Sequence, residues 1–352
     1  MDDAAQAERF RSSDRASRQI FHIAHGEPGA VLAVRAAPPP SPQDGAIIVR
    51  VTHAPIHPGD LAMIAGNPNG GRPAVIGAEG RVPGFEGVGI IESIAPAGIR
   101  AGRLAPGMRV AFFPANGAWQ SRTMVAPFAI VPVPDGVPDG VAAQLLINTL
   151  TACLVVRAAL RASPASLSGA ILLQTAAGSA VGKLITILAL ESGLQPVRLV
   201  RSRSGAEALA GLGLSGDIIA TDQPDWSERL GDSIGDRPVH AAVDAVGGAM
   251  TAALARHVSD DGTVVAYGAL DPGPSDMRSF VPRRLTLKGV SLSAWMMEPE
   301  AQRARDVETA LRLAKDRPDL FAVSRAYPPE EIAAAVEAVA APGKPGTVLL
   351  KF

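Results

Sequence analysis

Thiols are almost absent from this sequence, and aromatic rings are few. Its 352 residues include a single cysteine, Cys153, and only 4% are Phe, Trp or Tyr. One cysteine excludes an internal disulfide and any zinc site built from several thiolates. We therefore expect a protein of a reducing compartment. Because no base lies near Cys153 in the sequence, we expect its thiol to be a small buried apolar group.

An excess of charge of either sign is also lacking, because 33 Lys and Arg balance 34 Asp and Glu to a net charge of -1. This balance argues against the basic surfaces that bind nucleic acid or anionic membranes. The longest uncharged run, residues 163–182, is broken by Pro164 and Gln174, so we expect no membrane span. The N-terminus starts with acidic residues and lacks the apolar core of a signal peptide. We expect a soluble, cytoplasmic protein with a small-molecule substrate.

What the chain does contain is enough apolar sequence for two domains. Hydrophobic residues make up 47% and charged residues 19%, and the length exceeds one ordinary core. Through residues 20–140, short apolar runs alternate with clusters of Pro and Gly, which is typical of a barrel or a partly open sandwich. The strands expected there are Val31–Val34, Ala46–Val51, Gly87–Ile94, Arg109–Phe113 and Met124–Val131.

The pattern changes near Asn148, where apolar strands begin to alternate with helical segments. The strands expected there are Ala170–Gln174, Val197–Val200, Asp217–Ala220, His240–Val246 and Thr263–Tyr267, with a last strand at Thr347–Phe352. The expected helices are Val181–Leu190, Ala206–Leu212, Ala304–Lys315 and Glu330–Ala340. Alternating strands and helices predict a doubly wound parallel sheet, so the fold class is α/β.

A run of very small residues separates the strand ending at Gln174 from the helix that follows. The strict GxGxxG pattern is not met, because its glycine positions hold Ala177, Ser179 and Gly182. Such a turn still lets the backbone approach a pyrophosphate, and the helix N-terminus offers free N–H groups to it. We predict dinucleotide binding by Ala177, Gly178, Ser179, Ala180, Val181 and Gly182. The alternative is an ordinary tight strand-to-helix turn.

The residues after the next strand indicate which dinucleotide is bound. Arg201, Ser202 and Arg203 stand where NAD sites carry an acidic residue for the ribose hydroxyl. Two guanidiniums and a hydroxyl bind a 2′-phosphate through charge-assisted hydrogen bonds, whereas a carboxylate would repel it. The predicted cofactor is NADPH, and the alternative is a pair of solvated surface arginines. Tyr267 and Gly268 end a later strand at the edge where nucleotides bind, so they join the predicted cofactor site.

Three further motifs resemble those of the medium-chain dehydrogenase/reductases. Pro83–Gly89, which reads PGFEGVG, is similar to that family's GxExxGxV stretch, and Pro106–Val110 resembles its PGDRV turn. Val243–Gly248 resembles the D-x-VGG segment that ends the fourth strand of its nucleotide domain. The resemblance implies a GroES-like catalytic domain, residues 1–148 completed by 299–352, and a Rossmann domain, residues 149–298. It also implies a cofactor in the cleft between the two domains.

The resemblance further implies a branch without zinc. Alcohol dehydrogenases of the family carry a Cys in the segment matching Ala54–Asp60, a His at the position of Phe85 and a Cys near the interdomain junction. This chain has no such ligand at these positions, and its junction reads Leu146–Thr149, without Cys. The four-Cys structural lobe is absent as well, so no soft ligand set remains.

Within that branch, the chain most resembles the 2-enoyl thioester reductases, followed by the quinone oxidoreductases. The segments that carry this resemblance are Ala115–Gln120, Ile147–Ala152 and Leu287–Trp295, together with the spacing of the glycine turn. Two positions depart from the pattern. Pro68 or a neighbour stands where those reductases have a proton-donating tyrosine, and His57 stands where they have an asparagine.

Three residues are candidate catalytic groups. His57 titrates near neutral pH and is placed to donate a proton after hydride transfer; the alternative is a structural histidine bonded to loop backbone. By resemblance, Asn148 and Thr149 lie near the nicotinamide with Thr151, a predicted cofactor residue, and the alternative is helix capping. Asp60 either orients His57 or caps a local turn. Trp295 either walls the substrate pocket or packs in the core.

These observations predict an NADPH-dependent reductase that transfers hydride to an activated C=C bond of a 2-enoyl thioester or an enone. An NADPH:quinone oxidoreductase is the alternative within enzymes, because it needs less from a positioned proton donor. A non-catalytic NADPH-binding protein is the alternative outside enzymes. By resemblance, the Leu285–Leu292 segment is an edge strand that pairs two subunits, so a homodimer is expected.

Overall fold

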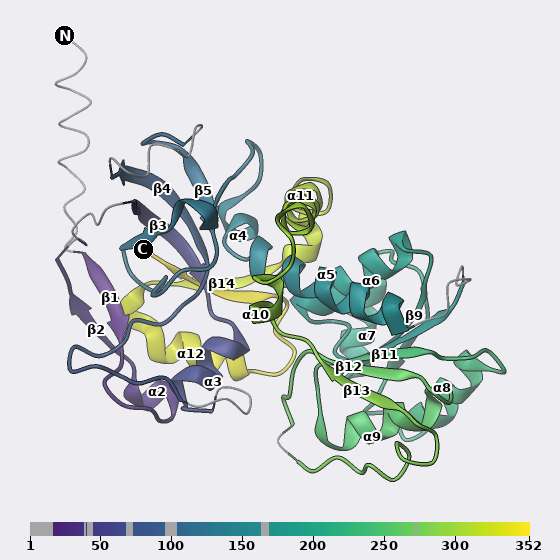
Figure 1. Ribbon diagram of the computed structural model, residues 1–352. Helices are drawn as coiled ribbons and strands as arrows, with labels where there is room; N and C mark the ends of the chain where they lie inside the picture. The colour runs from purple at the N-terminus through teal and green to yellow at the C-terminus, as the bar shows by residue number, and fades with distance from the viewer. Residues whose placement is uncertain are drawn as a thin grey trace. The chain divides into compact units, whose positions relative to one another are not determined.

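The computed structural model describes residues 17–38, 40, 45–67, 73–95, 104–162, 169–271 and 273–352. The chain divides into two compact units (Figure 1). The first comprises Met1–Gln144 with Val323–Phe352, and the second is Leu145–Ala322. The segment that resemblance places with the first domain, 299–352, is thus shared: 299–322 belongs to the second unit, because helix α11 (Glu300–Asp316) packs against α5 (Leu145–Ala162). The boundary falls at the start of α5, not at residue 148.

The first unit is built on a seven-stranded sheet in the order β14-β15-β3-β4-β5-β7, with β6 also paired to β3. The strands of this sheet are β3 (Ile47–Pro55), β4 (Gly87–Ile94), β5 (Arg109–Phe112), β6 (Arg122–Val125), β7 (Ile130–Pro132), β14 (Val323–Tyr327) and β15 (Thr347–Lys351). A separate two-stranded sheet pairs β1 (Arg18–Phe21) with β2 (Ala33–Ala36). The helices of the first unit are α2 (Pro28–Val31), α3 (Pro58–Ile64), α4 (Asp139–Ala142) and α12 (Ile332–Ala340), with short 3-10 turns η2 (Pro127–Ala129) and η4 (Pro329–Glu331). The C-terminal strand β15 pairs antiparallel with β3.

Alternation along the strands builds the core of this unit. Ile47, Val49 and Val51 of β3 point to one side and are buried with Phe112 of β5 and Val336 of α12. Residues two apart in a strand share a face, so one apolar stripe per strand is enough to close a core of several layers. The fold class expected from the sequence is confirmed here: a β-rich unit precedes an α/β unit.

The second unit contains a six-stranded parallel sheet in the order β10-β9-β8-β11-β12-β13. Its strands are β8 (Ile171–Gln174), β9 (Gln195–Val200), β10 (Ile218–Ala220), β11 (Ala241–Asp244), β12 (Thr263–Ala266) and β13 (Thr286–Gly289). Its helices, besides α5 and α11, are α6 (Ala180–Glu191), α7 (Arg203–Ala210), α8 (Trp226–Ile234), α9 (Gly248–His257) and α10 (Leu292–Trp295), and η3 (Pro318–Phe321) is a 3-10 turn. Helices α5 and α6 lie on one face of the sheet and α8 and α9 on the other (Figure 1).

This strand order is that of a Rossmann sheet, in which the order of the strands reverses between the first and the fourth. Those strands are β8 and β11, which lie side by side at the centre. β8 and β11 are buried along their whole length, as strands covered by helices on both faces must be. Ligands of such sheets bind beyond the carboxyl ends of the strands at the reversal.

Three expected strands differ from the structure. The Val31–Val34 strand begins later, as β2, because Pro28 starts the one-turn helix α2. Met124–Val131 is two strands, since Pro127 opens a 3-10 turn between β6 and β7. The Leu285–Leu292 segment contains β13 but ends in helix α10, which the sequence pattern did not indicate.

Helix α5 is long and apolar enough to cross a membrane by length and composition, and it is the one such helix in the described part of the chain. More than half of this helix is buried inside the structure, and the core helix of a soluble protein has the same length and composition. Its partners are α6, α10, α11 and the strands β11 and β12. We therefore interpret α5 as a core helix of the second unit.

A buried carboxylate ties three helices of this unit together. Asp306 of α11 is 3% exposed and accepts two hydrogen bonds from Arg157 of α5, at 3.0 and 2.9 Å. It also accepts from the indole of Trp295 at 2.9 Å and from Gln302. Through these hydrogen bonds, the Asp306 carboxylate holds α10, which follows β13, against α11 and α5. Trp295 therefore packs in the core, which is the second of its two predicted roles.

Candidate functional site

The turn after β8 has the geometry of a nucleotide cradle. Ala176 adopts a left-handed backbone with φ 48°, and a side chain at Gly182 would place its Cβ 2.3 Å from the Ala176 carbonyl oxygen. Only glycine fits so close a crossing of backbone, so Gly182 is required for the helix to pack on the strand. The turn expected from the sequence is present, with alanine and serine at the other two glycine positions of the usual pattern.

Side chains on both sides hold this turn in place. Gln174, buried at the end of β8, donates to the Gly182 carbonyl at 2.6 Å, and its amide oxygen accepts from Thr186 at 2.9 Å. Ser179 caps α6 by accepting from the Gly182 amide at 3.0 Å. The first turn of α6 is thus fixed before any ligand arrives.

Hydrogen-bond donors remain free at this turn. The amides of Gly178, Ala180 and Val181 have no partner in the part of the chain that the structure describes. First-turn amides of a helix lack intrahelical partners and attract anions. The predicted residues of the turn therefore offer backbone N–H groups and the positive end of α6 to a pyrophosphate.

Tyr267 and Gly268 follow β12 at the same edge. The Tyr267 hydroxyl is buried beside Ser179 and has no well-aligned hydrogen bond to any described residue. Burial and the charge of Asp244 raise the pKa of Tyr267, so it remains a neutral phenol. A Cβ at Gly268 would lie 2.7 Å from the Ala245 carbonyl oxygen, so the chain there passes close to the end of β11. An unpaired buried hydroxyl next to free amides fits a bound dinucleotide.

Asp244, at the end of β11, was given no role by sequence reasoning, yet it organises this edge. Its fully buried carboxylate accepts from the hydroxyls of Thr175 at 2.8 Å and Thr251 at 2.6 Å. It also accepts from the amides of Val246 at 2.9 Å and Gly247 at 3.2 Å. The loops after β8 and β11 are therefore locked to each other. Its place in the D-x-VGG segment was the signal that could have found it.

We expect Asp244→Asn to destabilise the protein by about 1.5–3 kcal/mol, because an amide nitrogen would face donors where a charged acceptor stood. Loosening the loop after β8 should also weaken NADPH binding. Chemical unfolding and NADPH titration measure the two effects. Thr251→Val, which removes one of the bonds and keeps the shape, is the matched milder variant. An Asp244→Asn protein with wild-type stability and affinity would show that the carboxylate does not organise this edge.

The three residues predicted to bind the 2′-phosphate end β9 and begin α7. Arg201 is exposed, and its guanidinium has no partner among the residues described. Ser202 caps α7 by accepting from the Gly205 amide at 3.2 Å. Arg203 donates to the side chain of Gln223 at 3.1 Å. Arg201 is thus ready to meet an anion, whereas Arg203 would have to leave Gln223.

Asn148, Thr149 and Thr151 all lie within helix α5, which starts at Leu145. The capping alternative for Thr149 is therefore wrong, because the helix began a full turn earlier. Thr149 is completely buried, and its hydroxyl oxygen lacks a hydrogen-bond partner within the described chain. Asn148 is buried as well, and Thr151 is half-buried. An orphaned buried hydroxyl in the helix is the observation that keeps Thr149 a candidate for ligand contact.

His57 lies in the first unit, at the end of the connection from β3 to α3. Its Nε2–H donates to Glu86 at 2.6 Å, and the Glu86 side chain is 1% exposed. Desolvation alone would lower the pKa of His57, but the hydrogen bond and charge of Glu86 and the charge of Asp60 raise it overall. His57 therefore holds its proton more tightly than a free imidazole. The His57 side chain also faces the backbone of Asp60 in a capping box at the start of α3.

Asp60 performs the capping role that was one of its two alternatives. One carboxylate oxygen accepts from the His57 amide at 2.8 Å and so starts α3. The other oxygen is buried with no partner in the described structure, and burial raises the pKa of Asp60 to about 6. Glu86 was not singled out by the sequence, although it lies in the PGFEGVG stretch. The His57 ring bonds the Glu86 carboxylate in addition to its place in the backbone cap of α3.

The motif around Glu86 is held by close packing. Gly84 has φ 93°, and a Cβ there would lie 2.3 Å from the Trp119 ring. Trp119 is fully buried and donates from its indole to the Pro55 carbonyl at 3.1 Å, just before His57. The glycine, the tryptophan and the end of β3 thus fix the His57–Glu86 pair.

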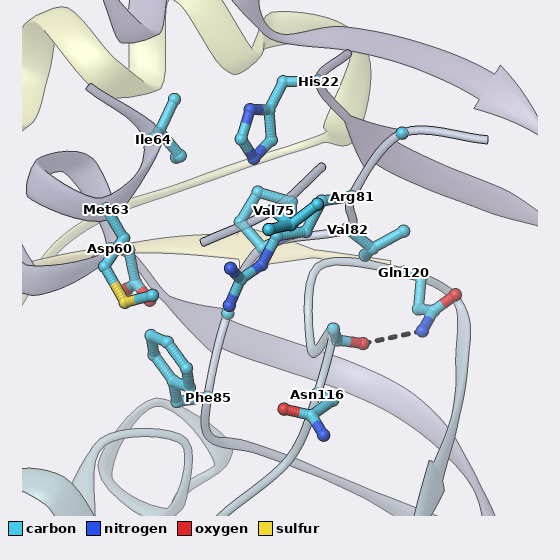
Figure 2. A pocket seen from close by; sticks show the side chains of 14 residues that line it. His22, Asp60, Met63, Ile64, Val75, Arg81, Val82, Phe85, Asn116 and Gln120 are labelled. Carbon is cyan, nitrogen blue, oxygen red and sulfur yellow. Dashed lines mark hydrogen bonds between the residues drawn. The ribbon is translucent and has the colours of Figure 1, made fainter. Parts of the chain in front are cut away.

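A cavity of about 410 Å³ opens in the same unit (Figure 2). Its walls come from α3, from residues 75–85 and from the loop before β6, with His22 beside them. Asp60 and Phe85 line it, whereas His57 does not. Pro68, at the place of the expected tyrosine, lies outside the described residues.

The structure does not gather all the predicted catalytic residues within one unit. His57 belongs to the first unit, while Asn148 and Thr149 belong to the second with the whole predicted cofactor set. Among the residues described, no group of three or more His, Cys, Asp or Glu side chains could hold a metal ion. Cys153 is buried, and burial raises the pKa of its thiol to about 12, in keeping with an apolar role.

Comparison with known proteins gives a consistent result. Residues 180–316 match the family model described as zinc-binding dehydrogenase. A mitochondrial enoyl-[acyl-carrier-protein] reductase of Xenopus tropicalis is 27% identical over 323 residues, which cover 90% of this chain and 88% of the relative. A presumptive NADPH:quinone reductase from Bacillus thuringiensis superposes with a TM-score of 0.83 at 26% identity, covering 96% of this chain and 99% of the other. The mycobacterial protein Rv1454c, solved with NADPH, has the same fold, with a TM-score of 0.81 at 22% identity over 96% and 100%.

Proposed function

We propose that this chain, a zinc-free member of the medium-chain dehydrogenase/reductases, is an NADPH-dependent reductase of activated C=C bonds, of the 2-enoyl thioester or enone type. The observation that carries the proposal is the cradle of the second unit. Free amides at the start of α6 lie after β8, and an unpaired arginine, not an acidic residue, follows β9. Relatives that reduce enoyl groups match the chain over most of its length.

NADPH, when bound, supplies the hydride. The amides of Gly178, Ala180 and Val181 bind its pyrophosphate, and Arg201 binds the 2′-phosphate. The free hydroxyls of Thr149 and Tyr267 are available to the rest of the dinucleotide. Binding energy from the phosphates positions the reacting end without being part of the reaction itself.

His57 is the proposed proton donor in place of the missing tyrosine. Glu86 accepts from Nε2 and favours the protonated imidazole, which would supply a proton to the carbanion or enolate after hydride transfer. Before the transfer, the Glu86 carboxylate balances the positive charge of the buried imidazolium. Asn148 remains a further candidate donor of a hydrogen bond to the substrate oxygen.

A quinone reductase is the second candidate, and two observations favour it. The expected tyrosine is absent from the sequence, and a quinone needs less from a positioned acid. The Bacillus structure is also described as a protein that reduces quinones. A non-catalytic NADPH-binding protein is the third possibility, motivated by the few acid–base groups.

Loss of NADPH absorbance with crotonyl thioesters, enones and 1,4-quinones separates these functions. We expect turnover with the first two classes and slow or no turnover with quinones. Preferred reduction of quinones would support the second candidate. Tight NADPH binding without turnover on any of the three would overturn the reductase proposal.

We also propose that the protein is a cytoplasmic homodimer that pairs through β13. All four residues of this strand are exposed, and it is the last strand of the sheet. An unpaired edge strand with exposed backbone groups is suited to pair with a second copy. Light scattering of the eluting protein should give the mass of two chains, and a monomer at micromolar concentration would contradict this.

A further inference from the structure

The cavity of the first unit contains a cation without a counter-charge. Arg81 lines it, and its backbone is clamped to His22 by two hydrogen bonds, at 3.0 and 2.8 Å. Figure 2 shows the Arg81 side chain extending across the middle of the pocket view. Its half-buried guanidinium makes no hydrogen bond or ion pair with any residue that the structure describes.

The other half-buried arginines that the structure describes in this unit are all paired. Arg109 and Arg122 face the carboxylates of Asp139 and Glu92, at 3.4 and 2.7 Å. Arg18 pairs with Glu330, and Arg35 donates to the Glu79 carbonyl and stacks on a phenylalanine ring. Partly desolvated cations are normally compensated in this way. Arg81 is the exception among these described arginines, and it lines the cavity.

Asp60, the carboxylate in the same cavity, is not the partner of Arg81. The two side chains form no ion pair, and one Asp60 oxygen is bonded to the His57 amide. The charged groups that act on Asp60 are His57 and Glu86, and Arg81 is not among them. The positive charge of Arg81 is therefore available to a ligand.

The other residues that line the cavity suit an uncharged organic group attached to the anion. Met63, Val82 and Phe85 give an apolar wall, and Asn116 places an unpartnered amide at the cavity's exposed side. A volume of about 410 Å³ falls in the range of small-molecule sites. Apolar walls with one fixed cation select a short organic chain that ends in a negative group.

We propose that this cavity is a subsite in which Arg81 binds an anionic group of the substrate, a carboxylate or a phosphate. This inference rests on the proposed reductase function in one respect, which is that the ligand is the enzyme's substrate. The binding of an anion by Arg81 does not depend on that function. A carboxylate would belong to an unsaturated oxo acid, and a phosphate to the phosphopantetheine arm of an enoyl thioester. Arg81 is then a specificity-determining residue, remote from the hydride transfer.

The test compares Arg81→Met, which keeps most of the side chain's length, with the wild type on two matched substrate pairs. The carboxylate pair is trans-4-oxo-2-pentenoate and neutral trans-3-penten-2-one. The phosphate pair is crotonyl phosphopantetheine and crotonyl pantetheine. We expect the variant to raise KM about tenfold for the anionic member of one pair, since one charge-assisted hydrogen bond is lost at a half-exposed site. The kcat and the KM for both neutral members should not change.

Two controls complete the experiment. Arg50→Met removes an exposed arginine of the same unit and should change none of these values. Arg81→Lys should recover part of the anion preference, because the charge returns without the planar fork. The pair that responds identifies the source of the anion.

Equilibrium binding keeps the proposal testable even if no substrate turns over. Titration calorimetry with 4-oxopentanoate and with pantetheine 4′-phosphate should show about tenfold tighter binding of one of them to the wild type than to Arg81→Met. Equal binding by both proteins would overturn the anion subsite. Lack of turnover together with Arg81-dependent binding would overturn the reductase function and leave the subsite in place.

Discussion

Replacing Arg201 and Arg203 together by alanine is expected to raise the KM for NADPH roughly a hundredfold and to leave the KM for NADH almost unchanged. Each charge-assisted hydrogen bond to a phosphate is worth on the order of 1.5–3 kcal/mol, and 1.4 kcal/mol is tenfold in affinity. Both side chains are exposed, which keeps the expected effect near the lower end of the sum. The kcat should change little, because the phosphate is far from the reacting carbon.

The single variants should not be equivalent. Arg201 has no partner to give up, whereas Arg203 must leave Gln223 before it can bind a phosphate. We therefore expect Arg201→Ala to account for most of the loss in NADPH affinity. Arg256→Ala, an exposed arginine on α9 of the same unit, is the matched control. A wild type that uses NADH as well as NADPH, or a double variant that loses both cofactors equally, would give these arginines another role.

The nucleotide half of the site was readable from the sequence because its determinants are local. β8, the turn of small residues and α6 follow one another directly in the chain. The hydrophobic periodicity and the run of small side chains therefore predict them together. The arginines follow the next strand at a spacing that the βαβ unit fixes. Ser202 was the exception, because its hydroxyl caps α7. A serine at this place can cap a helix or bind a phosphate, and the sequence does not distinguish the two roles.

The other half of the site depends on contacts between residues far apart in the chain. His57 was found as a titratable group in a motif, but its partner Glu86 comes just before β4, 29 residues further along the chain. Arg81 was invisible because an arginine is unremarkable in a loop until its lack of a partner is seen. Asp244 likewise bonds Thr175 across two neighbouring strands. Sequence patterns report periodicity, and they do not report which buried polar groups meet.

Element boundaries failed where proline or a short segment intervened. Pro127 divided one expected strand into β6 and β7, and β1 was missed because four residues carry too little alternation. Helix α5 was read as a junction, since the resemblance directed attention to Asn148 and Thr149 and not to the apolar residues around them. The helix begins before both, which removes their capping role.

Removing Glu86 should produce a large loss of stability. We expect Glu86→Ala to destabilise it by about 3–5 kcal/mol at pH 6, because a buried imidazolium would lose the carboxylate it bonds at 2.6 Å. In the wild type, the folded-state pKa of His57 is raised, so the pair's contribution is fully present below pH 6.5 and declines as pH rises through the folded pKa. The difference between the two proteins should therefore shrink as the pH is raised from 6 to 9. Guanidinium unfolding across this range measures it.

In Glu86→Ala the desolvation of His57 remains, and it is the largest single influence on that residue. The pKa of His57 should then fall below its ordinary value of about 6.5, which histidine NMR titration detects directly. His57→Asn, with a neutral amide at the same place, should make the cost of Glu86→Ala nearly independent of pH. If His57 is the proton donor, both Glu86→Ala and His57→Asn should lower kcat with KM for NADPH unchanged. A cost that stays constant from pH 6 to 9 would mean that the pair is not ionised, and the proton would then have to come from another group.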